Sequence, residues 1–496
     1  MSRTRRRSRL AGVIAAAAVL SLALGVGVAT AQDEGISQPI DFVHNVSQAP
    51  APVTATVFSN GPKVQVGRAI CTTATSNAAN VVTDCDGSNP HNETSIAVNP
   101  RNGSNIIGGL NDYQLSVNPG GHIGETIHSR AHVTFDGGRT WSEYPLWSNL
   151  PYQATGDPAV AFDASGHAYY ATLGFRFLGP ANVQSPDVLV SNSGNGGRTW
   201  STRRVATGTG NFGSAGDVLD KEYITAWGSG NALLTWDDFK QGPHGSVISV
   251  RIFTSVTHNF GATWSAPRLV SGNLTESFAP YPVHTADGRV FVAFLNTVND
   301  VTGRDDYEVV EVSPTTGARV AGPFTVGHTI DGLTDYPFAF GSPTYHDSLF
   351  RSWASGNIAT DPTNGAHLAV IWSDMRNSPR PAPRDPYAAT TNSDIVVSQS
   401  FNHGRTWSAP RALARTNDQW MPWGVYDTAG KLRIGFFDRH YDSANHRYGY
   451  TLATESSAGS LTFSYRQLTT GLSGPTRDNR WFAATVKSTF PNATTF

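Results

Sequence analysis

Four aspartates recur in this chain, each at the end of a short apolar stretch. They are Asp112, Asp238, Asp374 and Asp438. Arg376 and Arg439 stand close behind two of them. Carboxylates can act as general acids and bases, and an arginine can hold a carboxylate through two parallel hydrogen bonds. A residue that returns in the same place also favours a repeated structural bond, so both interpretations stay open.

A second set of polar residues does not follow that pattern. Arg176, Arg351 and Lys221 occur once each in their surroundings. Glu222, Tyr223 and Tyr281 stand at the start of predicted strands. A side chain at the entry to an inner strand can point toward the centre of the fold.

One phrase occurs four times and marks a tight turn. Its copies are Thr134 to Trp141, Ser193 to Trp200, Thr257 to Trp264 and Ser400 to Trp407, with the template S/T-x-D/N-x-G-x-T-W. The acid or amide is Asp136, Asn195, Asn259 or Asn402. Asp and Asn hydrogen-bond to turn amides, Gly accepts a positive φ, and Thr and Trp favour a new strand. Weaker copies occur at Ser313 to Val320 and Ser456 to Phe463.

A companion phrase precedes each turn and reads as strand, turn, strand. The six copies begin at Glu93, Asp157, Lys221, Tyr281, Gly356 and Pro422. With the strands beside each turn, every unit holds four antiparallel strands. Six such units predict an all-β protein, a β-propeller of about six four-stranded blades. The composition agrees, since 49 Gly, 29 Pro and 12 Trp are typical of a turn-rich β protein.

Strand order separates two ends of each blade. If the innermost strand runs from an upper to a lower end, the four recurring turns lie at the lower end, and the longer loops lie at the upper end. Insertions follow Asn111, Phe175 and Arg376, and another spans 322–355. Long loops in a compact repeat are more often functional than not, although flexibility is the alternative. The chemistry is therefore expected at the upper end.

The recurring turn resembles the Asp-box, or BNR repeat, of the sialidase superfamily. The resemblance covers roughly residues 90–467 and rests on several turns in register with the companion phrase. It implies an exo-alpha-sialidase-like propeller with its site at the upper end. The R-I-P motif of many sialidases is absent, and the equivalent position reads "HNETSIAVNP" from His91.

The resemblance also implies roles for individual residues. In sialidases three arginines hold the substrate carboxylate, a tyrosine assisted by a glutamate is the nucleophile, and an aspartate is the acid and base. The catalytic candidates here are Asp112, Glu222 and Tyr281. The candidates for substrate binding are Arg176, Arg376, Arg439, Trp353 and Trp420. Trp353, Trp420 and Trp423 are expected to stack on sugar rings.

The first residues are predicted to be an export signal. Residues 1–31 hold five arginines, an apolar run from Leu10 to Val28 and the small residues Ala29-Thr30-Ala31. A membrane anchor is the alternative, and both Sec and twin-arginine export fit. The mature chain is expected to be secreted, with an N-terminal segment at 32–90, a propeller at 91–469 and a C-terminal segment at 470–496. Either terminal segment can supply a strand that closes the ring, and residues 470–496 are also a candidate for part of an extra blade.

The net charge limits which classes of binding partner are expected, and the two cysteines predict a disulfide. The signal holds five of the 36 Lys+Arg and no acid, which leaves 31 against 38 Asp+Glu and a formal charge of -7. This mild acidity argues against nucleic acid, and the absence of a later apolar span argues against a membrane. Cys71 and Cys85 are predicted to form a disulfide, with a metal pair as the weaker alternative. We expect a monomer that acts on a glycan or polysaccharide.

No cofactor is predicted. The 15 His include no H-E-x-x-H motif, so a catalytic zinc has no support. Structural calcium is a candidate only near Asn299 to Asp306. The segment Gly208 to Gly213 matches G-x-G-x-x-G, but no βαβ unit surrounds it, and we interpret it as a loop.

Three functions follow from these patterns. The first is a secreted exo-glycoside hydrolase of sialidase type that removes terminal acidic sugars. The second is a non-catalytic propeller that binds a glycan or a protein, which the absent R-I-P motif favours. The third is a polysaccharide lyase on the same scaffold.

Overall fold

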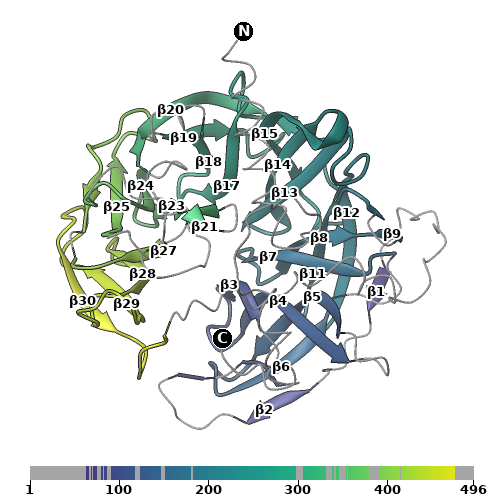
Figure 1. The fold of residues 1–496 in the computed structure, drawn as a ribbon, viewed down its shortest axis with the longest axis horizontal. Helices are drawn as coiled ribbons and strands as arrows, with labels where there is room; N and C mark the ends of the chain where they lie inside the picture. Colours follow the sequence, from purple (N-terminus) through teal and green to yellow (C-terminus); the bar gives the residue numbers. More distant parts are fainter. Residues whose placement is uncertain are drawn as a thin grey trace, which may run out of the picture. The chain divides into compact units, whose positions relative to one another are not determined.

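The computed structural model is all-β, with six four-stranded antiparallel blades of a six-bladed β-propeller (Figure 1). It describes most of residues 91–474, with gaps at 118–122, 147–150, 180–181, 298–304, 379–390 and 414 and over much of 331–355, and short stretches between 63 and 85. The predicted fold class is confirmed. The signal peptide and most of the C-terminal segment lie outside the described residues.

The chain divides into two compact units, which are described separately. The first unit is residues 1–268 with 481–496, and the second is residues 269–480. Blades one to three belong to the first unit, and blades four to six belong to the second.

The first unit contains three consecutive blades. Blade one is β3 (His91–Val98), β4 (Ile106–Val117), β5 (Ile123–Thr134) and β6 (Thr140–Pro145). Blade two is β7 (Ala154–Phe162), β8 (Ala168–Phe175), β11 (Asp187–Ser193) and β12 (Trp200–Ala206). Blade three is β13 (Gly216–Trp227), β14 (Asn231–Gln241), β15 (Val247–Thr257) and β16 (Arg268–Leu269).

The second unit contains the other three blades. Blade four is β17 (Ser277–His284), β18 (Val290–Asn296), β19 (Asp305–Val312) and β20 (Arg319–Thr329). Blade five is β23 (Gly356–Asp361), β24 (Asn364–Asp374), β25 (Asp394–Ser400) and β26 (Arg411–Ala412). Blade six is β27 (Gln419–Tyr426), β28 (Leu432–Asp438), β29 (Gly449–Glu455) and β30 (Phe463–Gln467).

Short elements occupy the connections. They are β9 (Phe177–Gly179) with β10 (Asn182–Val183), the 3₁₀ turn η1 (Pro243–Gly245), and β21 (Phe338–Ala339) with β22 (Ser342–Pro343). The insertion after Asn111 differs from the loop that the sequence predicted. β4 and β5 instead continue as one hairpin, paired from Ile106 opposite Thr134 to Val117 opposite Ile123. Among the described residues, no helix is long and apolar enough to cross a membrane.

Strands from the N-terminal segment widen two blades. β1 (Lys63–Gln65) pairs with the outer strand β12, and β2 (Thr72–Ala74) pairs with the outer strand β6. All four strands of blade six come from residues 419–467. The described N-terminal strands therefore cover the outer edges of blades one and two. An outer β-strand edge left unpaired would expose backbone hydrogen-bonding groups.

The four recurring turns, here called box turns, show why the template has these residue types. In the first, Asp136 Oδ1 accepts the Thr140 amide at 2.9 Å and the Thr134 hydroxyl at 2.8 Å, and Gly138 N donates to Thr134 Oγ1 at 2.9 Å. The other three box turns repeat the last two bonds, with Asn195, Asn259 and Asn402 in place of Asp136.

The four box turns lie at the lower ends of their blades, as strand order predicted. Asn105, in the turn between β3 and β4, donates to Thr134 O at 3.2 Å and to Gly196 O of the next blade at 3.0 Å. Inner-strand turns and box turns therefore share one end. Apolar residues fill the space between neighbouring blades, with Tyr169 and Trp236 in the core between blades two and three, and Trp372 in the core between blades four and five.

Candidate functional site

The inner strands of five blades carry the same irregularity at the upper end. The pairing with the second strand shifts there, and one non-glycine residue adopts a positive φ. These residues are Glu93 (52°), Asp157 (55°), Lys221 (48°), Ala279 (53°) and Met421 (47°). A left-handed conformation costs a non-glycine residue roughly 1–2 kcal/mol, so five instances indicate a feature of the fold. The residue types differ, and function must come from that difference.

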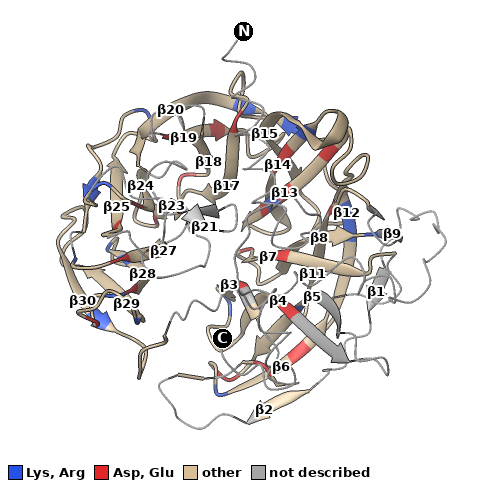
Figure 2. Cartoon of the chain, in the orientation of Figure 1, with Lys and Arg blue, Asp and Glu red and all other residues tan. Residues whose placement is uncertain are grey.

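In the first unit the bulge residues are charged and converge. Lys221 Nζ lies 2.7 Å from Asp157 Oδ2 on β7 and 3.8 Å from Glu93 Oε1 on β3. Asn111 supports both acids, because its Nδ2 donates to Glu93 Oε2 at 2.9 Å and its Oδ1 accepts the Asp157 amide at 2.9 Å. Figure 2 shows acidic residues on these inner strands. We call Glu93, Asp157, Lys221 and Glu222 the charged cluster.

Glu222, next to Lys221, is the most perturbed member of the charged cluster. Its side chain is 1% exposed, and neither carboxylate oxygen has a hydrogen-bond partner among the described residues. Burial, followed by the nearby charge of Asp157, raises the pKa of Glu222 well above its ordinary value. An ionised carboxylate without a partner is very costly inside a protein. Burial therefore favours the protonated, neutral form of the Glu222 carboxyl.

This arrangement combines a proton donor, ion-paired carboxylates and a cation. Glycoside hydrolysis requires two carboxyl groups, one that protonates the leaving oxygen and one that activates water or attacks the sugar. Acids in different environments can divide these roles, since burial holds one of them neutral. Side chains of Lys221 and Glu93 remain 22% and 27% exposed, so polar groups of a ligand can reach the charged cluster.

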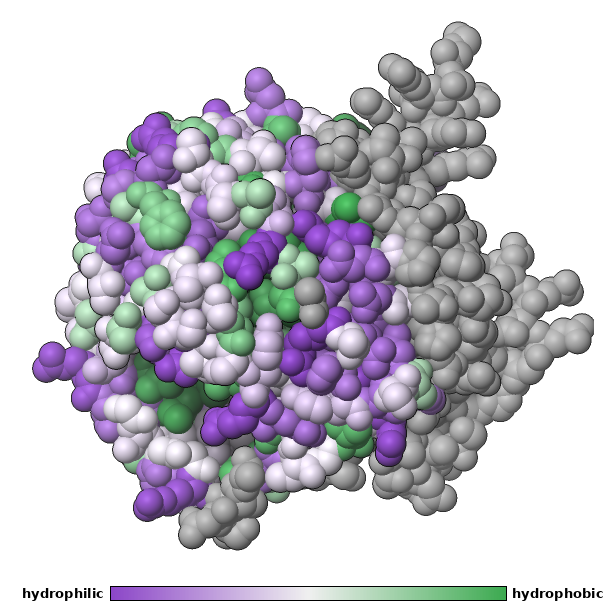
Figure 3. All heavy atoms as spheres, turned by 90° about the vertical axis from the view of Figure 1, so that its left-hand side faces the viewer, coloured by the Kyte–Doolittle hydropathy of each residue, from purple (hydrophilic) through white to green (hydrophobic). Residues whose placement is uncertain are grey.

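In the second unit the same region is apolar and aromatic. Tyr281 on β17 and Trp423 on β27 meet edge to face, with ring centroids 5.6 Å apart. Met421, Trp423 and Val425 alternate along β27 and are 42%, 41% and 52% exposed. Figure 3 shows the molecule from the side of the second unit. Hydrophobic residues form small patches among hydrophilic ones on this face. Exposed aromatic rings of this kind can stack on the apolar faces of sugars.

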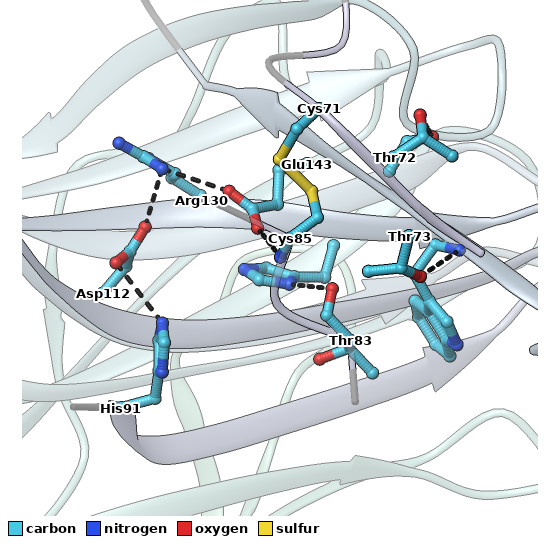
Figure 4. The surroundings of a disulfide bond; sticks show 12 residues. Cys71, Thr72, Thr73, Thr83, Cys85, His91, Asp112, Arg130 and Glu143 are labelled. Carbon is cyan, nitrogen blue, oxygen red and sulfur yellow. Dashed lines mark hydrogen bonds and ion pairs between the residues drawn. A yellow bond between two sulfur atoms is a disulfide. The ribbon is translucent and has the colours of Figure 1, made fainter. Parts of the chain in front are cut away.

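Asp112, a predicted acid and base, lies inside blade one (Figure 4). It is fully buried, 3.0 Å from Arg130 and 3.4 Å from His91. Arg130 also contacts Glu143 at 3.1 Å, and Glu143 accepts the amide of Cys85 at 2.7 Å. These contacts connect blade one to the disulfide loop, which favours the structural interpretation of the recurring aspartates.

The three predicted substrate-binding arginines each contact an acid of their own blade. Arg176 pairs with Asp187 at 3.2 Å, Arg376 with Asp374 at 2.6 Å, and Arg439 with Asp418 at 3.1 Å. Arg439 has no exposed surface. This geometry gives no support to a carboxylate clamp made of these three side chains, because each guanidinium already holds a carboxylate.

The predicted sugar-stacking residues have different outcomes. Trp353 lies outside the described residues. Trp420 is 3% exposed and packs against Tyr345 and Phe437, with Arg439 over its ring at 5.4 Å. Trp423, three residues further along β27, is the exposed one. Buried and exposed residues alternate from Trp420 onward along β27, so Trp420 and Trp423 lie on opposite faces of the strand.

The predicted disulfide between Cys71 and Cys85 is present. Among the described residues, the one group of three potential metal ligands is Cys71, Cys85 and Glu143, and the disulfide leaves its sulfurs unable to ligate. Residues 299–304 of the calcium candidate lie outside the described residues.

Glu93, Asp157 and Lys221 were not among the predicted site residues. They are, however, the first residues of the first three companion phrases, and that position is charged only there. Aligning the six phrases and comparing their starts could have found them. The phrases alone do not reveal the bulges that bring these three side chains together.

Comparisons with known proteins show no family for this chain. No protein-family model and no curated protein matches the chain. Similar solved structures include a protein of unknown function from Dyadobacter fermentans DSM 18053, with 12% identity over 76% of this chain and 95% of that chain and a TM-score of 0.42. The Hadza microbial sialidase Hz136 has 13% identity over 71% and 69%, with a TM-score of 0.39. A PL25 ulvan lyase has 12% identity over 75% and 77%, with a TM-score of 0.39.

Proposed function

We propose that this protein is a glycoside hydrolase whose acid and base lie in the charged cluster. The observation that carries the proposal is Glu222, a buried carboxyl beside the Asp157–Lys221 ion pair that has no hydrogen-bond partner in the described part of the chain. Such a group is costly to the fold, and functional sites are where proteins retain perturbed acids. The Glu222 carboxyl would protonate the leaving oxygen, and Asp157 would activate water or attack the sugar. Lys221 would hold the Asp157 carboxylate in position.

The leaving group of the substrate provides a sharp test. Glu222→Gln keeps the shape of the side chain and removes the proton, so cleavage of an alkyl glycoside should fall by ~10²–10⁴-fold. A dinitrophenyl glycoside needs little acid assistance, so its cleavage should fall far less. Asp157→Asn should impair both substrates.

Glu308→Gln is the matched control. Glu308 is also buried, and burial raises its pKa to about 7, but it lies on β19 and outside the charged cluster. Equal loss in the Glu222→Gln and Glu308→Gln variants would indicate a general effect on the fold. If Glu222→Gln reduced the cleavage of both glycosides equally, Glu222 would not be the general acid.

The finer proposal concerns the substrate. We propose terminal sugars of glycans, with acidic sugars and an exo-alpha-sialidase-like specificity as the first to examine, because Lys221 supplies a partly exposed cation at the charged cluster. A panel of aryl glycosides that includes sialosides would test this. Release of neutral sugars alone would contradict the acidic specificity. An unsaturated product that absorbs in the ultraviolet would instead indicate a polysaccharide lyase.

One observation favours a second function, glycan binding without turnover. Trp423 and Tyr281 form an exposed aromatic pair that does not require the charged cluster. Binding of a glycan that is weakened by Trp423→Ala, together with no turnover of any glycoside by the wild-type protein, would support this function over hydrolysis.

We also propose export to an oxidising compartment after cleavage before Gln32. The disulfide between Cys71 and Cys85 supports this, because disulfides persist mainly outside the reducing cytosol. Expression with residues 1–31 in place, followed by sequencing of the N-terminus of protein from the medium, would test it. Protein that stays in the cell with Met1 intact would contradict export.

A further inference from the structure

At the upper ends of the blades, an aspartate and an arginine usually form an ion pair, here called a clasp. Asp112 pairs with Arg130 at 3.0 Å, Asp187 with Arg176 at 3.2 Å, Asp374 with Arg376 at 2.6 Å, and Asp438 with Arg415 at 2.9 Å. All four aspartates are fully buried. Because the same kind of ion pair recurs in four blades, we interpret it as structural. A blade that has both residues without the ion pair requires another explanation.

Among the described residues of blade three, an aspartate and an arginine lie side by side without forming this ion pair. Asp238 on β14 and Arg251 on β15 are direct cross-strand partners near the upper end of blade three. Asp238 Oδ1 and Arg251 Nε are both buried, and neither has a hydrogen-bond partner among the described residues. An unmade hydrogen bond at a buried polar atom costs roughly 1–3 kcal/mol. We call this pair the open clasp.

Charges around the open clasp balance. Lys240 contacts Asp217 at 2.6 Å, and the hydroxyl of Thr209 donates to Asp217 at 2.7 Å. Two acids and two bases therefore face one another, and the group carries no net charge when Asp238 is ionised. Burial, and next the charge of Asp217, raises the pKa of Asp238 to about 7. Near neutral pH the carboxyl can thus both donate and accept a hydrogen bond.

We propose that the open clasp of Asp238 and Arg251 is a binding subsite for the hydroxyl groups of a neutral sugar. A hydroxyl carries one donor and two acceptor lone pairs, which match the free carboxylate oxygen and the free guanidinium N–H. The inference rests on the proposed glycan substrate and adds to it a neutral sugar unit, bound at blade three. It differs from the clamp predicted from the sequence, whose arginines all hold carboxylates of the protein.

The test measures binding in the catalytically impaired Glu222→Gln background. Neutral trisaccharides of glucose, galactose, xylose or arabinose are titrated by calorimetry, with sodium sulfate as the anionic probe. We expect at least one trisaccharide to bind, and Arg251→Gln and Asp238→Ala each to raise its Kd by tenfold or more. Arg447→Gln, at a 61% exposed arginine of blade six, is the matched control and should leave Kd unchanged. Thermal unfolding of each variant establishes that it is folded.

The outcomes separate this inference from the proposed function. Unchanged affinity in both open-clasp variants, or no binding of any neutral trisaccharide, would overturn the subsite. Sulfate binding that depends on Arg251, without sugar binding, would overturn it in favour of an anion site. Sugar binding that depends on Arg251 in a protein that cleaves no glycoside would retain the subsite and reject the hydrolase.

Discussion

The inner strands of the two units share a backbone feature and differ in chemistry. In the first unit the bulge residues Glu93, Asp157 and Lys221 form ion pairs. In the second unit, Ala279 and Met421 occupy the bulges, and Tyr281 packs against Trp423 two positions further on. A repeated fold thus fixes where inner-strand side chains converge, while the sequence of each copy decides whether a charged or an aromatic surface forms. In the proposed function, proton transfer would take place in the first unit, and the aromatic pair of the second unit would offer a surface for sugar rings.

The largest expected effect tests whether Trp423, and not Trp420, forms the exposed aromatic surface. Trp420→Ala should lower the free energy of unfolding by ~3–5 kcal/mol, because it removes a buried ring. Trp423→Ala should cost under about 1 kcal/mol, since its ring is 41% exposed, and should weaken glycan binding. Denaturant unfolding and glycan titration measure the two effects. A larger loss of stability from Trp423→Ala would contradict the assignment.

The next effect concerns the pH dependence of stability. A carboxyl whose folded pKa is raised binds a proton that the unfolded chain releases, so stability falls as pH rises from near 4 to the folded pKa. Glu222 in the first unit and Glu308 in the second, with a pKa of about 7, both act in this direction. Unfolding midpoints should fall between pH 5 and 8, and each pKa unit corresponds to ~1.4 kcal/mol.

Replacing Glu222 or Glu308 by Gln should reduce the fall of the unfolding midpoint between pH 5 and 8, because each substitution removes one titrating carboxyl. Midpoints measured at pH 5, 6, 7 and 8 for both variants compare the two units directly. A wild-type stability that rises over this range would show that other groups dominate.

A smaller effect is expected at the cation of the charged cluster. Lys221→Met removes the partner of Asp157, which is only 6% exposed, and should cost ~1–3 kcal/mol. The double variant Lys221→Met with Asp157→Asn should recover part of this loss, because the unpaired charge is gone. Chemical denaturation of the two single variants and the double variant gives the coupling energy. Additive losses would mean that the ion pair contributes nothing.

The smallest effect is expected at a box turn. Asp136→Asn places in the first box turn the amide that the other three already contain, and Asn195 and Asn259 accept equivalent bonds. Melting temperature and any activity should remain within error of the wild type. A clear loss of activity with no loss of stability would contradict the assignment of chemistry to the upper end.

Much of the fold follows from the sequence because its signals are local. The box turn specifies its own hydrogen bonds through residues within eight positions, so four copies were sufficient to place the blades and their lower ends. The site was less predictable. Glu222 was identified from its place at the start of an inner strand, whereas Asp157, 64 residues earlier, became a site residue only through its contact with Lys221.

The sequence by itself determined the repeat, the six blades, the disulfide pair and the end of each blade where function is expected. Tertiary structure decided which acids are buried, which arginines are already paired and which of two nearby tryptophans is exposed. The physical reason is that burial and ion pairing depend on neighbouring blades and on bulges that rotate side chains between faces, and neither follows from local residue type.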